Sequence, residues 1–239
     1  MSSPVNLVVF DVDGTLLDNL VCEDECYTRA LRDRLGLHAM TSDWSEYEHV
    51  SDEGIAIEAF RRAFDATPSR EVLSAAADRF VALLTAAHAA QPIRPVSGAV
   101  ALLQTLPSRG WAVALATGAW RGAAVFKLTA AGIPYETLPI ATAEDGPART
   151  DIVRAAWLRA EHAHHTRFDR VVAVGDGAWD VEAARMLTLP FVGRGDGAGA
   201  ERLQIAGARV ILSDFRETED VITALESATT PSTPRPNDS

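Results

Sequence analysis

The sequence places acidic and hydroxyl side chains directly after short apolar runs. Three such segments stand in the chain: Asp11-Val12-Asp13-Gly14-Thr15, Leu115-Ala116-Thr117-Gly118 and Gly175-Asp176-Gly177-Ala178-Trp179-Asp180. A short apolar run that ends in turn residues is typical of a buried strand in a parallel sheet. Because the carboxyl ends of parallel strands lie at one edge of the sheet, we expect the three segments to meet in one crevice.

Such a crevice would hold the hydroxyl of Thr117 and the carboxylates of Asp11, Asp13, Asp176 and Asp180. Crowded carboxylates repel one another, and a hard divalent cation with oxygen ligands relieves that repulsion. Magnesium is the natural candidate. With a local cation of this kind, even an acidic protein can act on a small anion.

The elements that would position these residues change in character along the chain. Residues from about 92 onward alternate between strand and helix patterns, which argues for a parallel sheet covered on both faces. Three segments before that point have apolar residues at helical spacing: Glu23–Leu35, Gly54–Phe64 and Ser69–Ala90. We therefore expect an α/β core at residues 1–18 and 92–228 and an all-helical insertion at 19–91. Residues 229–239, rich in Pro, Ser and Thr, are expected to be a disordered tail.

Composition narrows the class of protein. The net charge of −11 would repel phosphate backbones, so a nucleic-acid partner is not expected. The N-terminus lacks the features of a signal peptide, and no stretch approaches the roughly 20 apolar residues of a spanning helix. We expect a soluble cytoplasmic protein with no membrane partner, acting as a monomer or homodimer. Cys22 and Cys26 are interpreted as reduced thiols.

In this order, the segments resemble the motifs of the haloacid dehalogenase superfamily, and specifically its phosphatase branch. DVDGTLLD resembles the first motif, LATG the second and GDGAWD the fourth. A helical cap inserted between the first motif and the second strand is also an arrangement of that family. The resemblance covers nearly the whole chain and implies a Rossmann-like α/β core, a helical cap and magnesium as cofactor.

The resemblance also implies catalytic roles. Asp11 would attack phosphorus and form an aspartyl-phosphate. Asp13 would protonate the leaving group and then activate water. Dehalogenases of the superfamily generally lack this second Asp, so its presence favours phosphoryl chemistry. Thr117 and the amide of Gly118 would bind the phosphoryl oxygens, aided by amides around Gly14.

For the metal, the resemblance implies Asp176, Asp11 and the backbone carbonyl of Asp13 as ligands. Asp180 would support the site indirectly or through a ligand water. The family's third motif normally supplies a lysine, and no lysine stands there. Arg149 is the favoured equivalent, and Lys127, the only lysine of the chain, is the alternative. If Arg149 has the role, Lys127 is expected on a solvated helix face.

A polar and aromatic cluster in the insertion is a candidate for substrate recognition or for packing between helices: Trp44, Tyr47, His49, Asp52 and Glu53. Of these, Tyr47, His49 and Asp52 are the candidate substrate contacts. His162, His164 and His165 are interpreted as surface residues at a helix end rather than a metal site. Residues 193–199 lack clean dinucleotide-loop spacing and are interpreted as a flexible connection.

The sequence leaves three hypotheses open. The first is a phosphatase that acts on a small phosphorylated metabolite in the manner of phosphoglycolate phosphatase. The second is a phosphomutase of the β-phosphoglucomutase type, and the third is a non-catalytic binding protein that has kept the fold. Mutases of that type gate the acid/base aspartate with a threonine and a histidine, and here those positions hold Asn19 and Glu23. Hydrolysis is therefore the favoured reaction.

Overall fold

The computed structural model of the protein describes residues 6–18 and 22–233. At its centre is a six-stranded sheet in the order β3-β2-β1-β4-β5-β6, and each neighbouring pair of strands is parallel. The strands are β1 (Asn6–Phe10), β2 (Trp111–Ala116), β3 (Ile140–Ala141), β4 (Arg170–Gly175), β5 (Phe191–Arg194) and β6 (Ile211–Leu212). The central strands are apolar almost throughout because helices cover both faces of the sheet.

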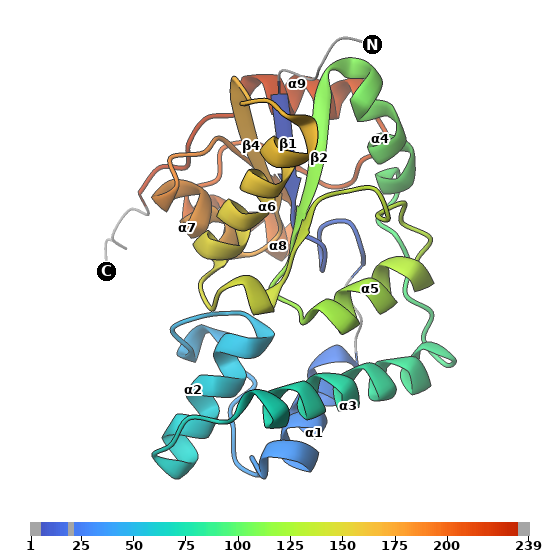
Figure 1. Cartoon of the computed structure of the whole chain (residues 1–239). Helices are drawn as coiled ribbons and strands as arrows, with labels where there is room; N and C mark the ends of the chain where they lie inside the picture. The colour runs from blue at the N-terminus through green and yellow to red at the C-terminus, as the bar shows by residue number, and fades with distance from the viewer. Residues whose placement is uncertain (1–5, 19–21, 234–239) are drawn as a thin grey trace.

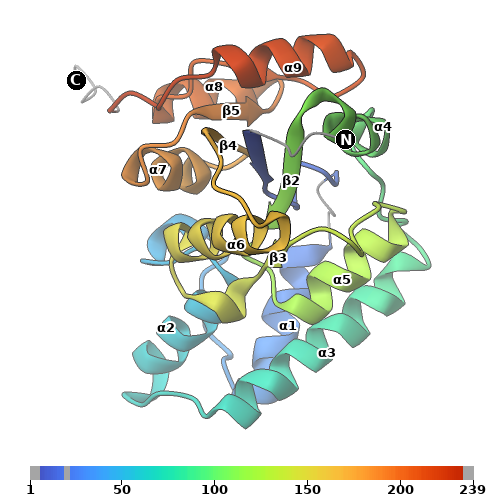
Figure 2. The same cartoon turned by 45° about the horizontal axis from the view of Figure 1, so that its top comes forward.

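Alternate residues of β1 point to opposite faces of the sheet. Val8 and Phe10 pack in a cluster with residues of three helices, α4 (Ala99–Thr105), α5 (Arg121–Ala130) and α9 (Thr218–Ser227). Leu7 and Val9 pack on the other face with residues of three helices, α6 (Arg149–His164), α7 (Ala178–Met186) and α8 (Gly197–Ala206). Figure 2 shows α6 and α7 on one side of the strands and α4 and α9 on the other. The sheet is therefore the middle of three layers.

A block of helices lies between β1 and β2 in the chain and has its own apolar cluster. It consists of α1 (Glu23–Leu35), α2 (Asp52–Phe64) and α3 (Arg70–His88), with a single helical turn at Trp44–Glu46. Tyr27, Ile55 and Phe80 are among the buried residues that hold the three helices together. Ser51 caps α2, since its side chain accepts a hydrogen bond from the amide of Gly54.

The helical block sits on the edge of the sheet where the strands end (Figure 1). The amide of Asp52 donates to the carbonyl of Gly118 at 2.7 Å, and the Ser51 hydroxyl donates to the carbonyl of Pro147 at 2.9 Å. Helix α5 (Arg121–Ala130) follows β2 and runs beside α3. Trp120 and Ala123 at its start belong to the apolar cluster of the helical block. The block is thus joined to the sheet through α5 as well as through the chain.

The expected fold class, a parallel α/β core with a helical insertion between β1 and β2, is confirmed. Single helical turns at Leu106–Arg109 and Ala143–Asp145 complete the core elements. The interpretation of residues 193–199 as a flexible connection is wrong, because Gly193 pairs in the sheet with Ile211 and α8 begins at Gly197. Helix α9 was not expected from the sequence either.

The structure differs from the expected disordered tail at the first residues of that segment. The amide of Phe191 donates to the carbonyl of Thr229 at 3.2 Å, and the amide of Ser232 donates to the carbonyl of Gly207 at 3.2 Å. Residues 229–233 therefore lie along the core instead of leaving it. Residues 234–239 are outside the described part of the chain, and so the expected disorder there stays a prediction.

Candidate active site

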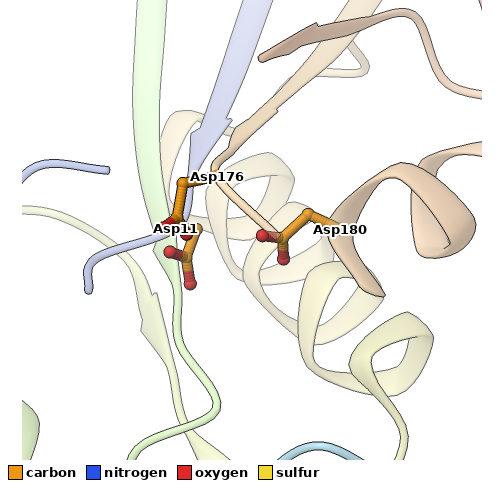
Figure 3. A group of neighbouring side chains, drawn as sticks. All are labelled: Asp11, Asp176 and Asp180. Carbon is orange, nitrogen blue, oxygen red and sulfur yellow. The ribbon is translucent and has the colours of Figure 1, made fainter. Parts of the chain in front are cut away.

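Three of the expected carboxylates meet at the carboxyl edge of the sheet. Asp11 follows β1, Asp176 follows β4, and Asp180 lies in the first turn of α7. Because β1 and β4 pair directly, with Phe10 opposite Val174, the first two side chains leave neighbouring strands at the same level. One carboxylate oxygen from each of the three lies within 4.8 Å of the others, and Figure 3 shows the side chains facing one another.

Burial and crowding make this group of carboxyls hold protons tightly. Burial raises the pKa of Asp11 well above its ordinary value, and the nearby charge of Asp180 raises it further. Burial and the charge of Asp180 likewise raise the pKa of Asp176 to about 7, and burial raises the pKa of Asp180. A divalent cation would stabilise the ionised forms, and Mg2+ prefers carboxylate oxygens of this kind. The donor set therefore fits magnesium.

Arg149 is the cation that lies against the group. It is the first residue of α6, and its side chain is largely buried. Its Nη1 donates to Oδ1 of Asp11 at 3.1 Å, and its Nε lies 3.2 Å from Oδ1 of Asp180. That Nε has no aligned hydrogen-bond partner. A guanidinium in this place lowers the pKa of Asp11 and offers donor groups to an anion bound beside it.

Asp13 and the segment after β2 form the other side of the crevice. The Thr117 hydroxyl lies 3.4 Å from Oδ2 of Asp13 as a long hydrogen bond and accepts a hydrogen bond from the amide of Ala119. Gly118 is packed so closely that a Cβ there would lie 3.1 Å from both Arg149 and the carbonyl of Val50. A side chain at Gly118 would therefore crowd the entrance to the site.

Gly14 gives the turn after β1 its shape. It has φ of 75°, in the left-handed region that residues with a Cβ rarely adopt. Its carbonyl accepts a hydrogen bond from Arg194 at 3.0 Å. Gly14 is not among the residues that line the cavity described below, so its expected part in phosphoryl binding stays a prediction.

Lys127 lies inside the protein, at the junction of the core and the helical block. Its side chain is 1% exposed, and its Nζ lies 2.6 Å from Oδ1 of Asp13. It also forms an ion pair with Glu23 of α1. The expectation of a solvated helix face is therefore wrong, because Lys127 is held by acidic side chains that are distant in the sequence. Arg149 contacts Asp11, whereas Lys127 contacts Asp13.

A cavity of about 690 Å3 opens between the sheet edge and the helical block. Its inner end is formed by the motif residues Asp11, Asp13, Thr117, Gly118, Arg149 and Asp176. Its outer wall comes from the helical block and combines aromatic and acidic side chains: Glu23, Asp24, Tyr27, Trp44, Asp52 and Phe80. The cavity is large enough for a small organic ligand whose anionic group reaches the sheet edge.

Of the three candidate substrate contacts in the helical block, one lines the cavity and two do not. Asp52 lines the cavity and accepts a hydrogen bond from the amide of Trp120 at 2.8 Å. Tyr47 and His49 do not line it. The ring of Tyr47 packs under the guanidinium of Arg62, whose central carbon lies 4.9 Å from the ring centre. The Nε2 atom of His49 lies 4.0 Å from Oε1 of Glu48.

Sequence reasoning missed several residues of the cavity wall. Glu23 and Tyr27 lie one turn apart on α1, so helical spacing could have shown that they share a face. It could not have shown that this face is turned toward the sheet edge. Trp179 and Arg202, which line the cavity from α7 and α8, gave no signal that separates them from ordinary surface residues.

Other features are peripheral to this site. His162 and His164 lie in the last turn of α6, and Asp11, Asp176 and Asp180 are the one group with metal-site spacing among residues 6–18 and 22–233. Cys22 and Cys26 are free thiols. Within the described part of the chain, no helix combines the length and apolar character needed to span a bilayer.

The fold and the site define an α/β protein with a helical insertion above an acidic crevice. Residues 5–187 match the family model described as "Hydrolase: haloacid dehalogenase-like hydrolase". The chain belongs to this family, which confirms the resemblance found in the sequence, and it is therefore a haloacid dehalogenase-like hydrolase. A comparison with curated proteins found no match.

Solved structures agree in fold at low sequence identity. A hydrolase from Pseudomonas syringae is 22% identical, with a TM-score of 0.67, 93% of this chain covered and 99% of that chain. CbbY from Rhodobacter sphaeroides, in complex with phosphate, is 21% identical with a TM-score of 0.67 and the same coverage. A predicted phosphoglycolate phosphatase from Haemophilus somnus is 18% identical, with a TM-score of 0.59, 90% of this chain covered and 97% of that chain.

Proposed function

We propose that this hydrolase is a magnesium-dependent phosphatase that releases phosphate from a small phosphate monoester. The observation that carries the proposal is the placement of Asp11, which lies beside two further carboxylates and accepts a hydrogen bond from Arg149. A nucleophile, a place for a hard cation and a fixed guanidinium are the elements that phosphoryl transfer needs.

In this proposal Asp11 attacks phosphorus and the bond from phosphorus to the ester oxygen breaks. Asp13 gives its proton to the departing oxygen and later takes one from the water that hydrolyses the aspartyl-phosphate. Thr117, the amide of Gly118 and Arg149 hold the phosphoryl oxygens as their charge changes. Since Arg149 contacts Asp11, we assign to it the role of the third-motif cation.

Asp11, Asp176 and the carbonyl of Asp13 would hold the metal ion, and Asp180 would support them directly or through water. Bound there, Mg2+ would offset the charge of the carboxylates and of the phosphoryl group. Arg149 and the metal would then balance the carboxylates from two sides. Residues 19–91 would act as the cap that selects the substrate and excludes water, with Asp52 as a contact.

Hydrolysis is favoured over transfer to a second hydroxyl. A mutase must protect its phosphoenzyme from water, and Glu23 stands at a position where mutases of the β-phosphoglucomutase type place a gating histidine. Asn19, the other position, lies outside the described residues. CbbY, a neighbour in fold, has also been solved with xylulose-1,5-bisphosphate, so an organic phosphate suits this architecture.

The test is phosphate release from p-nitrophenyl phosphate and from a panel of phosphorylated metabolites, with and without Mg2+. Wild-type protein should release phosphate only with the metal, and Asp11→Asn should be inactive while it unfolds at the same temperature. Full turnover in excess chelator would contradict the proposal. Incubation with β-glucose 1-phosphate and a trace of the bisphosphate tests the alternative, since glucose 6-phosphate formed faster than free phosphate would indicate a mutase.

A further inference from the structure

The buried ion-pair network around Lys127 connects the acid/base aspartate to the cap. The Lys127 ammonium lies 2.6 Å from Oδ1 of Asp13 and also pairs with Oε1 of Glu23. Asp13 comes from the loop after β1, Lys127 from α5 of the core and Glu23 from the first turn of α1. Three separate parts of the chain therefore meet at one ammonium group.

The network is too costly to be incidental packing. A lysine that is 1% exposed loses the hydration of its charge, and only close acidic partners compensate for that loss. Burial alone lowers the pKa of Lys127, but the charges of Asp13, Glu23 and Asp52 raise it above its ordinary value. Lys127 is therefore a fixed cation whose position depends on its acidic neighbours.

This cation decides how the Asp13 carboxyl is oriented. An ammonium group only donates hydrogen bonds, so Oδ1, which faces Lys127, is the accepting oxygen. The proton of the acid form then belongs on Oδ2, the oxygen beside the Thr117 hydroxyl. Because Asp13 and Thr117 both line the cavity, this orientation aims the proton at the space that the substrate would occupy.

We propose that Lys127 and Glu23 are positioning residues that hold Asp13 in the orientation needed to protonate the leaving group. The inference rests on the proposed phosphatase function. Glu23, from α1, pairs with the same Lys127 ammonium that pairs with Asp13. Without Glu23, Lys127 would lose one of its two ion-pair partners, and its ammonium would be held less firmly beside Asp13.

The experiment exploits the fact that a good leaving group needs no proton. As Asp11 bonds to phosphorus, p-nitrophenolate departs as an anion, whereas an alkoxide must receive the proton of Asp13. We would measure kcat/KM for p-nitrophenyl phosphate and for glycerol 1-phosphate. This constant covers the steps up to the first phosphoryl transfer and is unaffected by the later hydrolysis of the phosphoenzyme.

Glu23→Gln and Lys127→Met should lower kcat/KM for the alkyl ester by about a hundredfold, the scale of losing a general acid, and should leave the aryl ester within about threefold of wild type. Lys127→Arg should restore part of the alkyl activity, because it keeps the charge. Glu25→Gln, at an exposed position in the same turn of α1, is the matched control and should not change either constant.

Equal losses for both esters would overturn the inference, because they would indicate general damage rather than a misplaced acid. Unchanged activity in Glu23→Gln would overturn the role of Glu23. If Lys127→Met does not fold, Glu23→Gln decides the question alone, since it keeps the size of the side chain. Wild-type protein that is inactive toward both esters would refute the proposed function, and the acid role of Asp13 with it.

Discussion

Magnesium affinity should rise with pH, because the proposed ligands hold protons in the metal-free protein. Burial and Asp180 raise the pKa of Asp176 to about 7, and metal binding requires the ionised form, so protons compete with the metal below this pH. A group with a pKa of about 7 is ionised in about a tenth of molecules at pH 6 and about nine tenths at pH 8. The dissociation constant should therefore fall about tenfold between these values, or ~1.4 kcal/mol.

The stability of the metal-free protein should fall as the pH rises, whereas its affinity for magnesium increases. A carboxyl whose pKa is raised by folding stabilises the folded state when protonated. For Asp176 this contribution is complete below its ordinary pKa of 3.8 and is lost as the pH rises through about 7. Unfolding in chelator should occur at lower temperature at pH 8 than at pH 5, and added Mg2+ should restore more stability at pH 8.

The assay is calorimetric titration of Mg2+ into the protein at pH 6, 7 and 8, in buffers of different ionisation enthalpy that report proton release. Asp176→Asn should bind weakly. Asp33→Asn, at an exposed position on α1, is the matched control and should behave as wild type. Equal affinity at pH 6 and pH 8 with no proton released would refute the reasoning, because it would mean that the metal does not displace protons from this cluster.

Three further results are expected. Arg149→Ala should lower kcat at least about a hundredfold, the effect of losing one fixed transition-state contact. Arg149→Lys should recover part of the lost activity. If Arg149→Ala lowered kcat by less than about threefold, Arg149 would have no part in the mechanism. The cap residues that line the cavity include three acidic and no basic side chains. At pH 9, above the pKa of Asp52, kcat/KM for 2-hydroxyethyl phosphate and phosphoethanolamine should therefore exceed that for phosphoglycolate by about tenfold or more, and the reverse order would contradict this electrostatic argument. Burial raises the pKa of Asp52 to about 8, so its protonated form stabilises the folded state, an effect that is complete below pH 4 and is lost as the pH rises through 8. In chelator, Asp52→Asn should therefore unfold at a higher urea concentration than wild type at pH 8 and at about the same concentration at pH 4.

The sequence predicted the inner end of the site because strand geometry determines it. Once residues 6–10 and 170–175 form adjacent parallel strands, the carboxylates that follow them must share an edge. No packing detail is needed for that conclusion. The same holds for α1, where the expected bounds Glu23–Leu35 agree with the structure, since apolar spacing alone marks the helix.

The surroundings of Lys127 could not be predicted, because they depend on how two helices distant in the chain are placed. The lysine and Glu23 are 104 residues apart, and an isolated charge on a helix is ordinarily solvated. The cavity wall has the same limitation. Trp44 lines the cavity and Tyr47 does not, although both lie in one short segment, because the turn at Trp44–Glu46 directs them differently.

Helix α5 limits how freely this enzyme could exchange its cap with a relative. By chain order α5 is part of the α/β core, yet Trp120 and Ala123 are buried among the side chains of the inserted helices. A chimera that replaced only residues 19–91 would place a foreign surface against these two residues and would leave Lys127 without Glu23. The unit of exchange is therefore larger than the insertion: residues 120–127 would have to be transferred with it, although more than 25 residues separate them from its end.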